Sequence, residues 1–277
     1  MKPEWKIHRR FLTAGDIQLC CVDFGGNGED GPPALLLHGL AGRGNEWRST
    51  ASWLTQHCHV FALDQRGHGM SDKTSFDYTY DAYVHDAIDV IEQVSSAPVI
   101  LIGQSMGGKT AFLTAARRPD LVRGLIVVEA KVSEDPEAQK LVRDWFARWP
   151  VPFPTLADAK SFFGGNTLTG ETWIEFLEER PDGYWPLCDS ERLLAGLTQS
   201  SANDYWPEWE QITCPTLLVG GERSIFSQGE MQEMARRIPR GRYIVIPDAG
   251  HDLHLEQPEA WRRVAEEFLS ELELDGR

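Results

Sequence analysis

Six short apolar runs recur along the chain, and each is bounded by Gly, Pro or Asp. They occupy residues 34–38, 59–64, 98–103, 124–129, 215–220 and 242–247. Their apolar residues are almost continuous rather than alternating, which is typical of strands that are covered on both faces. The pattern therefore predicts a mostly parallel sheet packed between layers of helices.

Helical periodicity lies between several of these runs. Residues 80–94, 106–119 and 258–272 each place apolar side chains at spacings of three and four. Alternating strands and helices build right-handed βαβ units, so the fold class is α/β. Two further segments, 6–13 and 16–24, flank the turn at Ala14-Gly15-Asp16 and predict a hairpin at the sheet edge. Together these patterns predict an eight-stranded sheet.

The alternation stops between about residues 131 and 211. This stretch contains seven prolines and short helical patterns such as 137–149 and 172–180. We expect a helical cap at 131–211, inserted after strand 6 into a core domain formed by 1–130 and 212–277. Six of the ten tryptophans fall here: Trp145, Trp149, Trp173, Trp185, Trp206 and Trp209. They indicate either an aromatic, largely apolar pocket or simply the small core of the cap.

Charge and composition narrow the classes of partner. The net charge of −15 favours solubility and argues against nucleic acid or an anionic membrane as a partner. The N-terminus has no apolar targeting segment, and no stretch approaches the ~18 uninterrupted apolar residues of a membrane span. The five cysteines are scattered without metal-ligand spacing. We therefore expect a cytoplasmic protein with reduced cysteines, no metal and no cofactor.

The segment GQSMGG, residues 103–108, carries the strongest chemical signal. It is a G-x-S-x-G sequence that directly follows a predicted strand and opens a predicted helix. Such a turn holds the Ser105 hydroxyl out of the sheet, and the N–H of Met106 points to where an oxyanion forms. Ser105 is the candidate nucleophile, with an incidental tight turn as the alternative.

A serine nucleophile needs a base, and eight histidines are available. His251 follows the last predicted strand within AGH, residues 249–251, and His254 is its competitor. Loops at the carboxyl ends of strands carry the sites of α/β sheets, which favours His251. The loop after residues 34–38 offers the N–H of Leu40 as a second oxyanion donor and places Gly39 at the pocket. His38 is expected to shape that loop.

The chain resembles the α/β-hydrolase superfamily, specifically the serine branch of the capped group that includes epoxide-hydrolase and haloperoxidase-like sequences. The resemblance rests on His38-Gly39, DQRGHGMS (64–71), GQSMGG (103–108) and AGH (249–251), and it covers almost the whole chain. It implies the α/β-hydrolase fold, a mobile cap at 131–211 and a structural role for the 64–71 loop.

One position departs from the family pattern. The resemblance implies an aspartate after the penultimate strand, but Ser224 stands there. A serine cannot offset the charge of an imidazolium, so the acid of the triad is expected elsewhere. Glu129, at the end of the strand after the nucleophile helix, is the favoured acid and would pair with His251. The alternatives are Glu222 as the acid, or a structural salt bridge from Glu129 to Lys131 or an arginine.

These residues favour a serine hydrolase that cleaves a small, largely apolar carboxylic ester or lactone through an acyl-enzyme. Gly39 and Trp185 are the expected pocket residues. The same triad also suits a C–C bond hydrolase or lyase and a cofactor-free haloperoxidase. A non-catalytic small-molecule receptor on this fold is the third hypothesis. The substrate's identity and the oligomeric state are left open.

Overall fold

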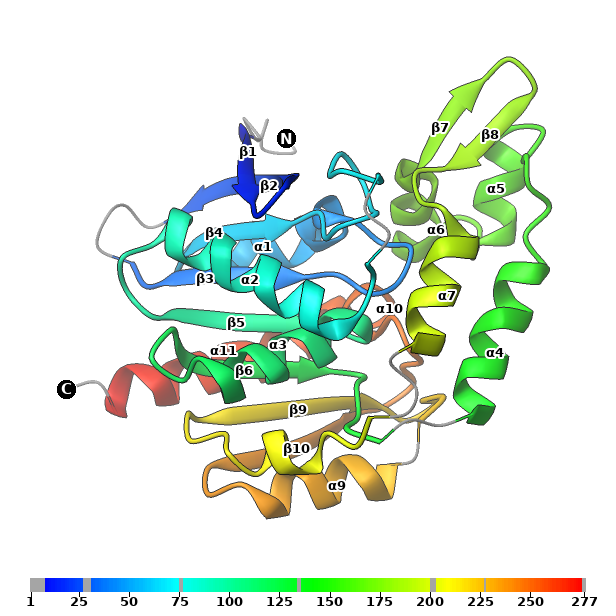
Figure 1. The fold of residues 1–277 in the computed structure, drawn as a ribbon. Helices are drawn as coiled ribbons and strands as arrows, with labels where there is room; N and C mark the ends of the chain where they lie inside the picture. The colour runs from blue at the N-terminus through cyan, green and yellow to red at the C-terminus, as the bar shows by residue number, and fades with distance from the viewer. Residues whose placement is uncertain are drawn as a thin grey trace.

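The computed structural model describes residues 8–26, 31–74, 77–133, 136–199, 203–226 and 228–275. Within these residues, eight strands form one sheet in the order β1-β2-β4-β3-β5-β6-β9-β10 (Figure 1). The first two pairings, β1 with β2 and β2 with β4, are antiparallel, and the other pairings are parallel. The strands are β1 (His8–Ala14), β2 (Ile17–Gly26), β3 (Pro33–Leu37), β4 (His59–Leu63), β5 (Val99–Gln104), β6 (Val122–Val128), β9 (Thr216–Gly221) and β10 (Gly241–Ile246).

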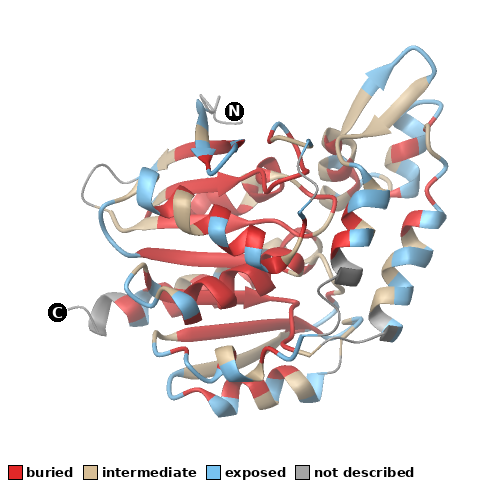
Figure 2. Ribbon diagram, viewed as in Figure 1, coloured by how far each residue is buried: buried red, intermediate tan, exposed pale blue. Residues whose placement is uncertain are grey.

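The predicted α/β fold class is confirmed. The six apolar runs correspond to β3, β4, β5, β6, β9 and β10, and the hairpin β1–β2 lies at the sheet edge. Residues 6 and 7 of the predicted first strand lie outside the described residues. Most residues of β3, β4, β5, β6 and β9 are buried (Figure 2), because both faces of the parallel sheet are covered.

Helices cover the two faces of the sheet. On one face α2 (Tyr80–Val94), α3 (Met106–Arg117) and α9 (Gln228–Arg237) pack against one apolar cluster. On the other face α1 (Arg48–Leu54), the short α10 (Leu253–Glu256) and α11 (Pro258–Asp275) pack against a second cluster, together with Trp47 at the end of the 3-10 helix Gly44–Trp47. The helices predicted at 80–94, 106–119 and 258–272 are therefore confirmed.

Most of the segment between β6 and β9 stands beyond one end of the sheet (Figure 1). It contains α4 (Pro136–Ala147), α5 (Leu156–Phe162), α6 (Leu168–Trp173), a 3-10 helix (Ile174–Phe176), β7 (Leu177–Arg180), β8 (Gly183–Pro186), α7 (Ser190–Gln199) and α8 (Trp206–Trp209). An aromatic cluster forms its core, with buried side chains at Phe146, Trp149, Phe153, Phe163, Trp173 and Phe176. Such rings contact one another edge to face, which stabilises a small core.

The helical pattern expected at 172–180 is only partly correct. The pattern at 172–180 predicted a helix, but the helical turns end at Phe176, and residues 177–180 pair with 183–186 as an antiparallel hairpin. Pro181-Asp182-Gly183 provides the turn, with Gly183 at φ +136°. Phe153 adds backbone hydrogen bonds to Tyr184 on the open side of the hairpin. The turn residues and the pairing with Phe153 therefore stabilise a hairpin at 177–186, although the local periodicity favours a helix up to residue 180.

The last part of the insertion packs on the core of the sheet instead of on the cap. The Trp209 ring lies 5.4 Å from that of Phe112 on α3, and its Nε1 donates to the carbonyl oxygen of Met234 at 2.8 Å. Tyr205 belongs to the same apolar cluster. A clean division between core and cap at residue 211 stays a prediction.

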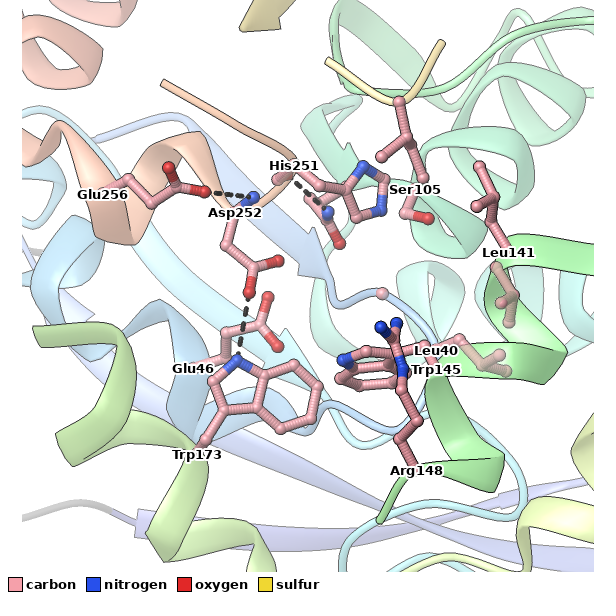
Figure 3. A pocket seen from close by; sticks show the side chains of 14 residues that line it. Leu40, Glu46, Ser105, Leu141, Trp145, Arg148, Trp173, His251, Asp252 and Glu256 are labelled. Atoms are coloured by element: carbon pink, nitrogen blue, oxygen red, sulfur yellow. Dashed lines mark hydrogen bonds between the residues drawn. The ribbon is translucent and has the colours of Figure 1, made fainter. Parts of the chain in front are cut away.

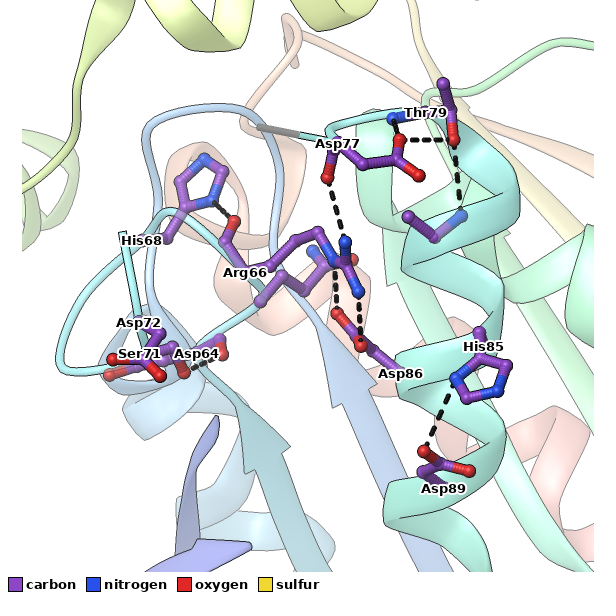
Figure 4. A network of polar contacts seen from close by, with 12 residues as sticks. Asp64, Arg66, His68, Ser71, Asp72, Asp77, Thr79, His85, Asp86 and Asp89 are labelled. Atoms are coloured by element: carbon purple, nitrogen blue, oxygen red, sulfur yellow. Dashed lines mark hydrogen bonds and ion pairs between the residues drawn. The ribbon is translucent and has the colours of Figure 1, made fainter. Parts of the chain in front are cut away.

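Two buried histidines shape the loops after β3 and β4 (Figure 4 shows the second). The Nε2 of His38 accepts from the N–H of Gln65 at 3.0 Å, and the Nε2 of His68 accepts from the N–H of Ala41 at 3.1 Å. Each Nδ1 donates to a backbone carbonyl oxygen, that of Gly39 for His38 and that of Arg66 for His68. Each ring therefore acts as donor and acceptor at once, which requires the neutral imidazole.

The charged residues of the 64–71 loop have structural partners. Arg66 makes two hydrogen bonds to Asp86 on α2, at 2.6 and 2.7 Å (Figure 4). Asp64 accepts from the N–H groups of Gly44 and Met70, at 2.6 and 2.8 Å. These contacts hold the two loops against each other and against α2, in agreement with the structural role expected for this motif.

We expect thermal stability to fall as the pH is lowered from about 7.5 to about 5. Burial lowers the pKa of His38 to about 4, and burial together with the neighbouring His38 lowers the pKa of His68 to about 3. In the unfolded chain both rings take up protons near pH ~6.5. The unfolded state therefore binds more protons in this window, and stability is lost as the pH falls toward the folded pKa values.

Melting temperatures measured at both pH values test this expectation. His68→Gln retains an acceptor but does not titrate, so it should show a smaller loss between the two pH values. His85→Gln, at an exposed position on α2, is the control and should follow the wild type. Equal losses for His68→Gln and the wild type would contradict the argument.

Candidate active site

Ser105 lies at the junction of β5 and α3 in a sharply bent backbone. Its φ is +52° and its ψ is −116°, a combination that is strained for a residue with a side chain. A Cβ at Gly103 would lie 2.1 Å from the Gly107 carbonyl oxygen, and one at Gly107 would lie 2.3 Å from the Leu37 carbonyl oxygen. Only glycine fits on either side of the bend. The G-x-S-x-G spacing therefore produces the local geometry that the sequence predicted.

Two backbone amides lie close to Ser105 in the chain or at the cavity, those of Met106 and Leu40. Met106 is the first residue of α3, and Leu40 follows β3 in the loop shaped by His38. Neither amide N–H donates a hydrogen bond to another described residue. Amides at a helix N-terminus and in a neighbouring loop are suited to bind an anion.

His251 lies in the loop after β10, and in the sheet β9 and β6 separate β10 from β5, which carries Ser105 at its end. Its ring lies beside Ser105, and both residues line one cavity (Figure 3). The Nδ1 atom lies 3.2 Å from Oε2 of Glu129. The ring and the Ser105 hydroxyl are not hydrogen-bonded in the described structure, and such catalytic contacts often tighten only with substrate.

Glu129 is fully buried where β6 ends, at a positive φ of +48°. Its Oε1 accepts from the N–H of Gly221 at 2.7 Å, and its Oε2 accepts from the Ser224 hydroxyl at 2.7 Å and from His251. Three donors offset the cost of burying this carboxylate. Among the described residues, Glu129 and Lys131 form no salt bridge, and the Nζ of Lys131 lies 3.5 Å from Oε2 of Glu230 instead.

Ser224 has a role that the sequence reasoning missed. It stands where the resemblance implies an aspartate, and its hydroxyl donates to the carboxylate that arrives from β6 instead. The N–H of Phe226 in turn donates to the same hydroxyl oxygen at 2.9 Å. The signal was present in the sequence, because a short donor at this position suits an acid that comes from the neighbouring strand.

The competing residues lie elsewhere. Glu222 is exposed, and its Oε2 accepts from the N–H of Asp248 at 3.0 Å. His254 is fully buried, with its Nε2 3.0 Å from Oε1 of Glu46 and its ring stacked on Trp47 at 4.5 Å. The structure therefore brings Ser105, Glu129 and His251 together and leaves Glu222 and His254 out of this group.

The electrostatic surroundings of His251 favour its protonated form. Burial lowers the pKa of the imidazole, but the hydrogen bond and the charge of Glu129 outweigh burial, and Asp252 and Glu256 add to the effect. The net pKa of His251 lies above its ordinary value. A ring of this kind is well suited to accept a proton from a neighbouring hydroxyl.

The cavity at Ser105 has a volume of about 300 Å³ and lies between the sheet and α4. Apolar side chains form one part of its wall: Leu40, Leu141, Val142, Trp145, Trp173 and Ile225. Charged side chains form another part: Glu46, Arg148, Asp252 and Glu256 (Figure 3). The lining is mainly apolar, and the charged side chains add a polar part that the tryptophan-rich composition did not predict.

Of the two pocket residues predicted from sequence, Gly39 lines the cavity and Trp185 does not. Trp185 lies on β8, where its Nε1 donates to Asp182 at 2.9 Å and Arg180 covers its ring. Arg148 was missed, although it follows the cavity residue Trp145 by one helical turn. Trp173 lines the cavity and donates from Nε1 to Asp252 at 3.0 Å.

The described residues contain no group of three or more His, Cys, Asp or Glu arranged to hold a metal ion. In the same part of the chain, every helix is too short or too polar to cross a membrane.

Comparisons with known proteins agree with this architecture. A 2-(acetamidomethylene)succinate hydrolase of Mesorhizobium japonicum is 26% identical over 249 residues, covering 86% of this chain and 88% of its own. An sn-1-specific diacylglycerol lipase of Danio rerio is 29% identical over 260 residues, covering 89% of this chain and 80% of its own. The crystal structure of an E-2-(acetamidomethylene)succinate hydrolase superposes with a TM-score of 0.86 at 25% identity, over 95% of this chain and 99% of its own.

The model of the alpha/beta hydrolase fold family matches residues 32–258, which include Ser105, Glu129 and His251. The chain is therefore an enzyme of the α/β-hydrolase family.

Proposed function

We propose that this enzyme is a serine hydrolase that cleaves a small carboxylic ester or lactone through an acyl-enzyme. The observation that carries the proposal is the 3.2 Å contact between Oε2 of Glu129 and Nδ1 of His251, whose ring lies beside Ser105 in the cavity that Leu40 also lines. A hydroxyl, an imidazole oriented by a buried carboxylate and two unpaired amides are the parts that acyl transfer requires.

The reaction follows from these positions. The Ser105 hydroxyl attacks the substrate carbonyl carbon while Nε2 of His251 takes its proton. Glu129 stabilises the resulting imidazolium, and the N–H groups of Leu40 and Met106 bind the oxyanion. The tetrahedral intermediate collapses, and His251 gives its proton to the departing alcohol. Water activated by His251 then cleaves the acyl-enzyme and restores the Ser105 hydroxyl.

An ester substrate agrees with the lipase relative, which by its name acts on diacylglycerol. The apolar wall formed by Leu141, Val142, Trp145 and Ile225 suits the hydrocarbon part of such a substrate. A lactone is the cyclic case of the same chemistry, in which the leaving alcohol stays attached to the acyl group.

Labelling with a fluorophosphonate probe is the direct experiment. We expect one covalent adduct, located at Ser105 by peptide mass spectrometry, together with the loss of p-nitrophenyl ester turnover. Ser105→Ala should take up no probe. If the folded wild-type protein is not labelled, the hydrolase proposal fails, and the small-molecule receptor becomes the better explanation.

Glu129→Gln should lower kcat by about 10⁴-fold, by analogy with removal of the acid from a Ser-His-Asp triad. The amide cannot stabilise the imidazolium that forms when Ser105 loses its proton. Glu222→Gln is the matched control, because Glu222 is the rival acid and its side chain accepts from the N–H of Asp248. Its turnover should stay within a few-fold of wild type, and the reverse ranking would transfer the acid role to Glu222.

A substrate that also carries a carboxylate is a second candidate. Arg148 is the cationic residue among those that line the cavity. The succinate hydrolase relative is named for a substrate of this chemical type. A guanidinium binds a carboxylate through paired, charge-assisted hydrogen bonds.

Two p-nitrophenyl esters of equal acyl length, the neutral butyrate and the anionic hemisuccinate, separate the two substrate classes. We expect Arg148→Ala to raise KM for the hemisuccinate by about 5- to 10-fold and to leave that of the butyrate unchanged, since a partly exposed ion pair contributes about 1 kcal/mol. Arg143→Ala, on α4 shortly before Arg148 but outside the cavity lining, is the control. Equal changes for both esters would rule out a carboxylate subsite at Arg148.

A further inference from the structure

Gln104 lies directly before Ser105 as the last residue of β5, and it is only 2% exposed. Its side chain lines the cavity, and its Nε2 donates to the main-chain oxygen of His251 at 3.0 Å. Among the described residues, this is the hydrogen bond that joins β5 to His251. The strand that carries the nucleophile therefore holds the backbone of the base.

The other end of the same carboxamide lies against the loop after β3. A Cβ built on Gly39 would lie 2.0 Å from Oε1 of Gln104 and 3.4 Å from Cβ of Ser105. Glycine at position 39 thus leaves the room that the carboxamide occupies. Gly39 precedes Leu40, whose amide is one of the two proposed oxyanion donors. The carboxamide therefore lies between the loop that carries His251 and the loop that carries Leu40.

The loop that carries His251 has other contacts with the residues around it. The N–H of Arg223 donates to the carbonyl oxygen of Ala249 at 2.8 Å, and the N–H of Gly250 donates to Glu256 at 2.8 Å. Glu129 binds only the ring of His251, through Nδ1. A ring held at Nδ1 can still shift with its backbone, and the bond from Gln104 restrains that backbone on the side nearest Ser105.

We propose that Gln104 is a positioning residue that sets the distance between His251 and Ser105. The proposal rests on the serine hydrolase function argued above. Two contacts then fix the base: Glu129 orients the ring, and Gln104 fixes the main chain from which the ring projects. Because a displacement of about 1 Å in an active site can cost about 100-fold in rate, this restraint acts on kcat more than on substrate binding.

Gln104→Met tests the proposal, because methionine has a similar length and packs in a buried site but cannot donate to the His251 carbonyl. We expect kcat for p-nitrophenyl butyrate to fall by about 10- to 100-fold, with KM within about 2-fold of wild type. The rate of fluorophosphonate labelling should fall by the same factor. The acid limb of the pH profile should move toward the ordinary histidine pKa, because the contact with Glu129 loosens.

Gln104→Glu provides a second variant of nearly the same shape. An ionised carboxylate cannot donate and faces the His251 carbonyl as a second acceptor, so it should lower kcat as well. Gln93→Met, at a surface position on α2, is the control for the substitution itself and should behave as wild type. Melting temperatures show which variants are folded.

The outcomes separate this proposal from the proposed function. If wild type is labelled at Ser105 and both folded Gln104 variants keep kcat within about 2-fold, the positioning role is overturned and the hydrolase proposal stands. A rise in KM with unchanged kcat would also overturn it, since it would make Gln104 a substrate contact. If wild type itself is not labelled, it is the hydrolase proposal that fails.

Discussion

The site depends on one buried carboxylate. Glu129 has no exposed surface, and Gly221, Ser224 and His251 all donate to its carboxylate, which offsets the cost of burying it. These donors come from the end of β9 and from the loops after β9 and β10, whereas Glu129 directly follows β6. The same hydrogen bonds therefore provide partners for a buried carboxylate, join three neighbouring strand ends and orient the imidazole.

The sheet supplies the frame that makes this convergence possible. In parallel strands all carboxyl ends meet at one edge, so Leu40, Ser105, Glu129 and His251 are neighbours although they are far apart in the chain. Strain is concentrated at this edge, where Ser105 and Glu129 both have positive φ. The rigid, fully covered strands β3, β5 and β6 hold these conformations in place.

The insertion between β6 and β9 forms part of the cavity wall, with both apolar and charged side chains. Its aromatic cluster places Trp145 and Trp173 at the cavity, and Arg148, directly after the end of α4, also lines it. Glu46, Asp252 and Glu256, from the segments that follow β3 and β10, also line the cavity. The cavity at Ser105 therefore has both apolar and charged side chains in its wall, and the insertion and the core each contribute both kinds.

The sequence by itself determined the features that depend on local sterics and periodicity. Continuous apolar runs identified the buried strands, the glycines around Ser105 specified the bend, and the odd carboxylate at the end of an apolar strand identified Glu129. Only the tertiary structure decided which groups complete them: the donors Gly221 and Ser224, the carboxamide of Gln104, Arg148 in place of Trp185 at the cavity, and the hairpin β7–β8 in place of a helix. The physical reason is that backbone conformation and burial follow from neighbouring residues. Hydrogen-bond partners and cavity walls arise from segments that meet only when the whole sheet has assembled.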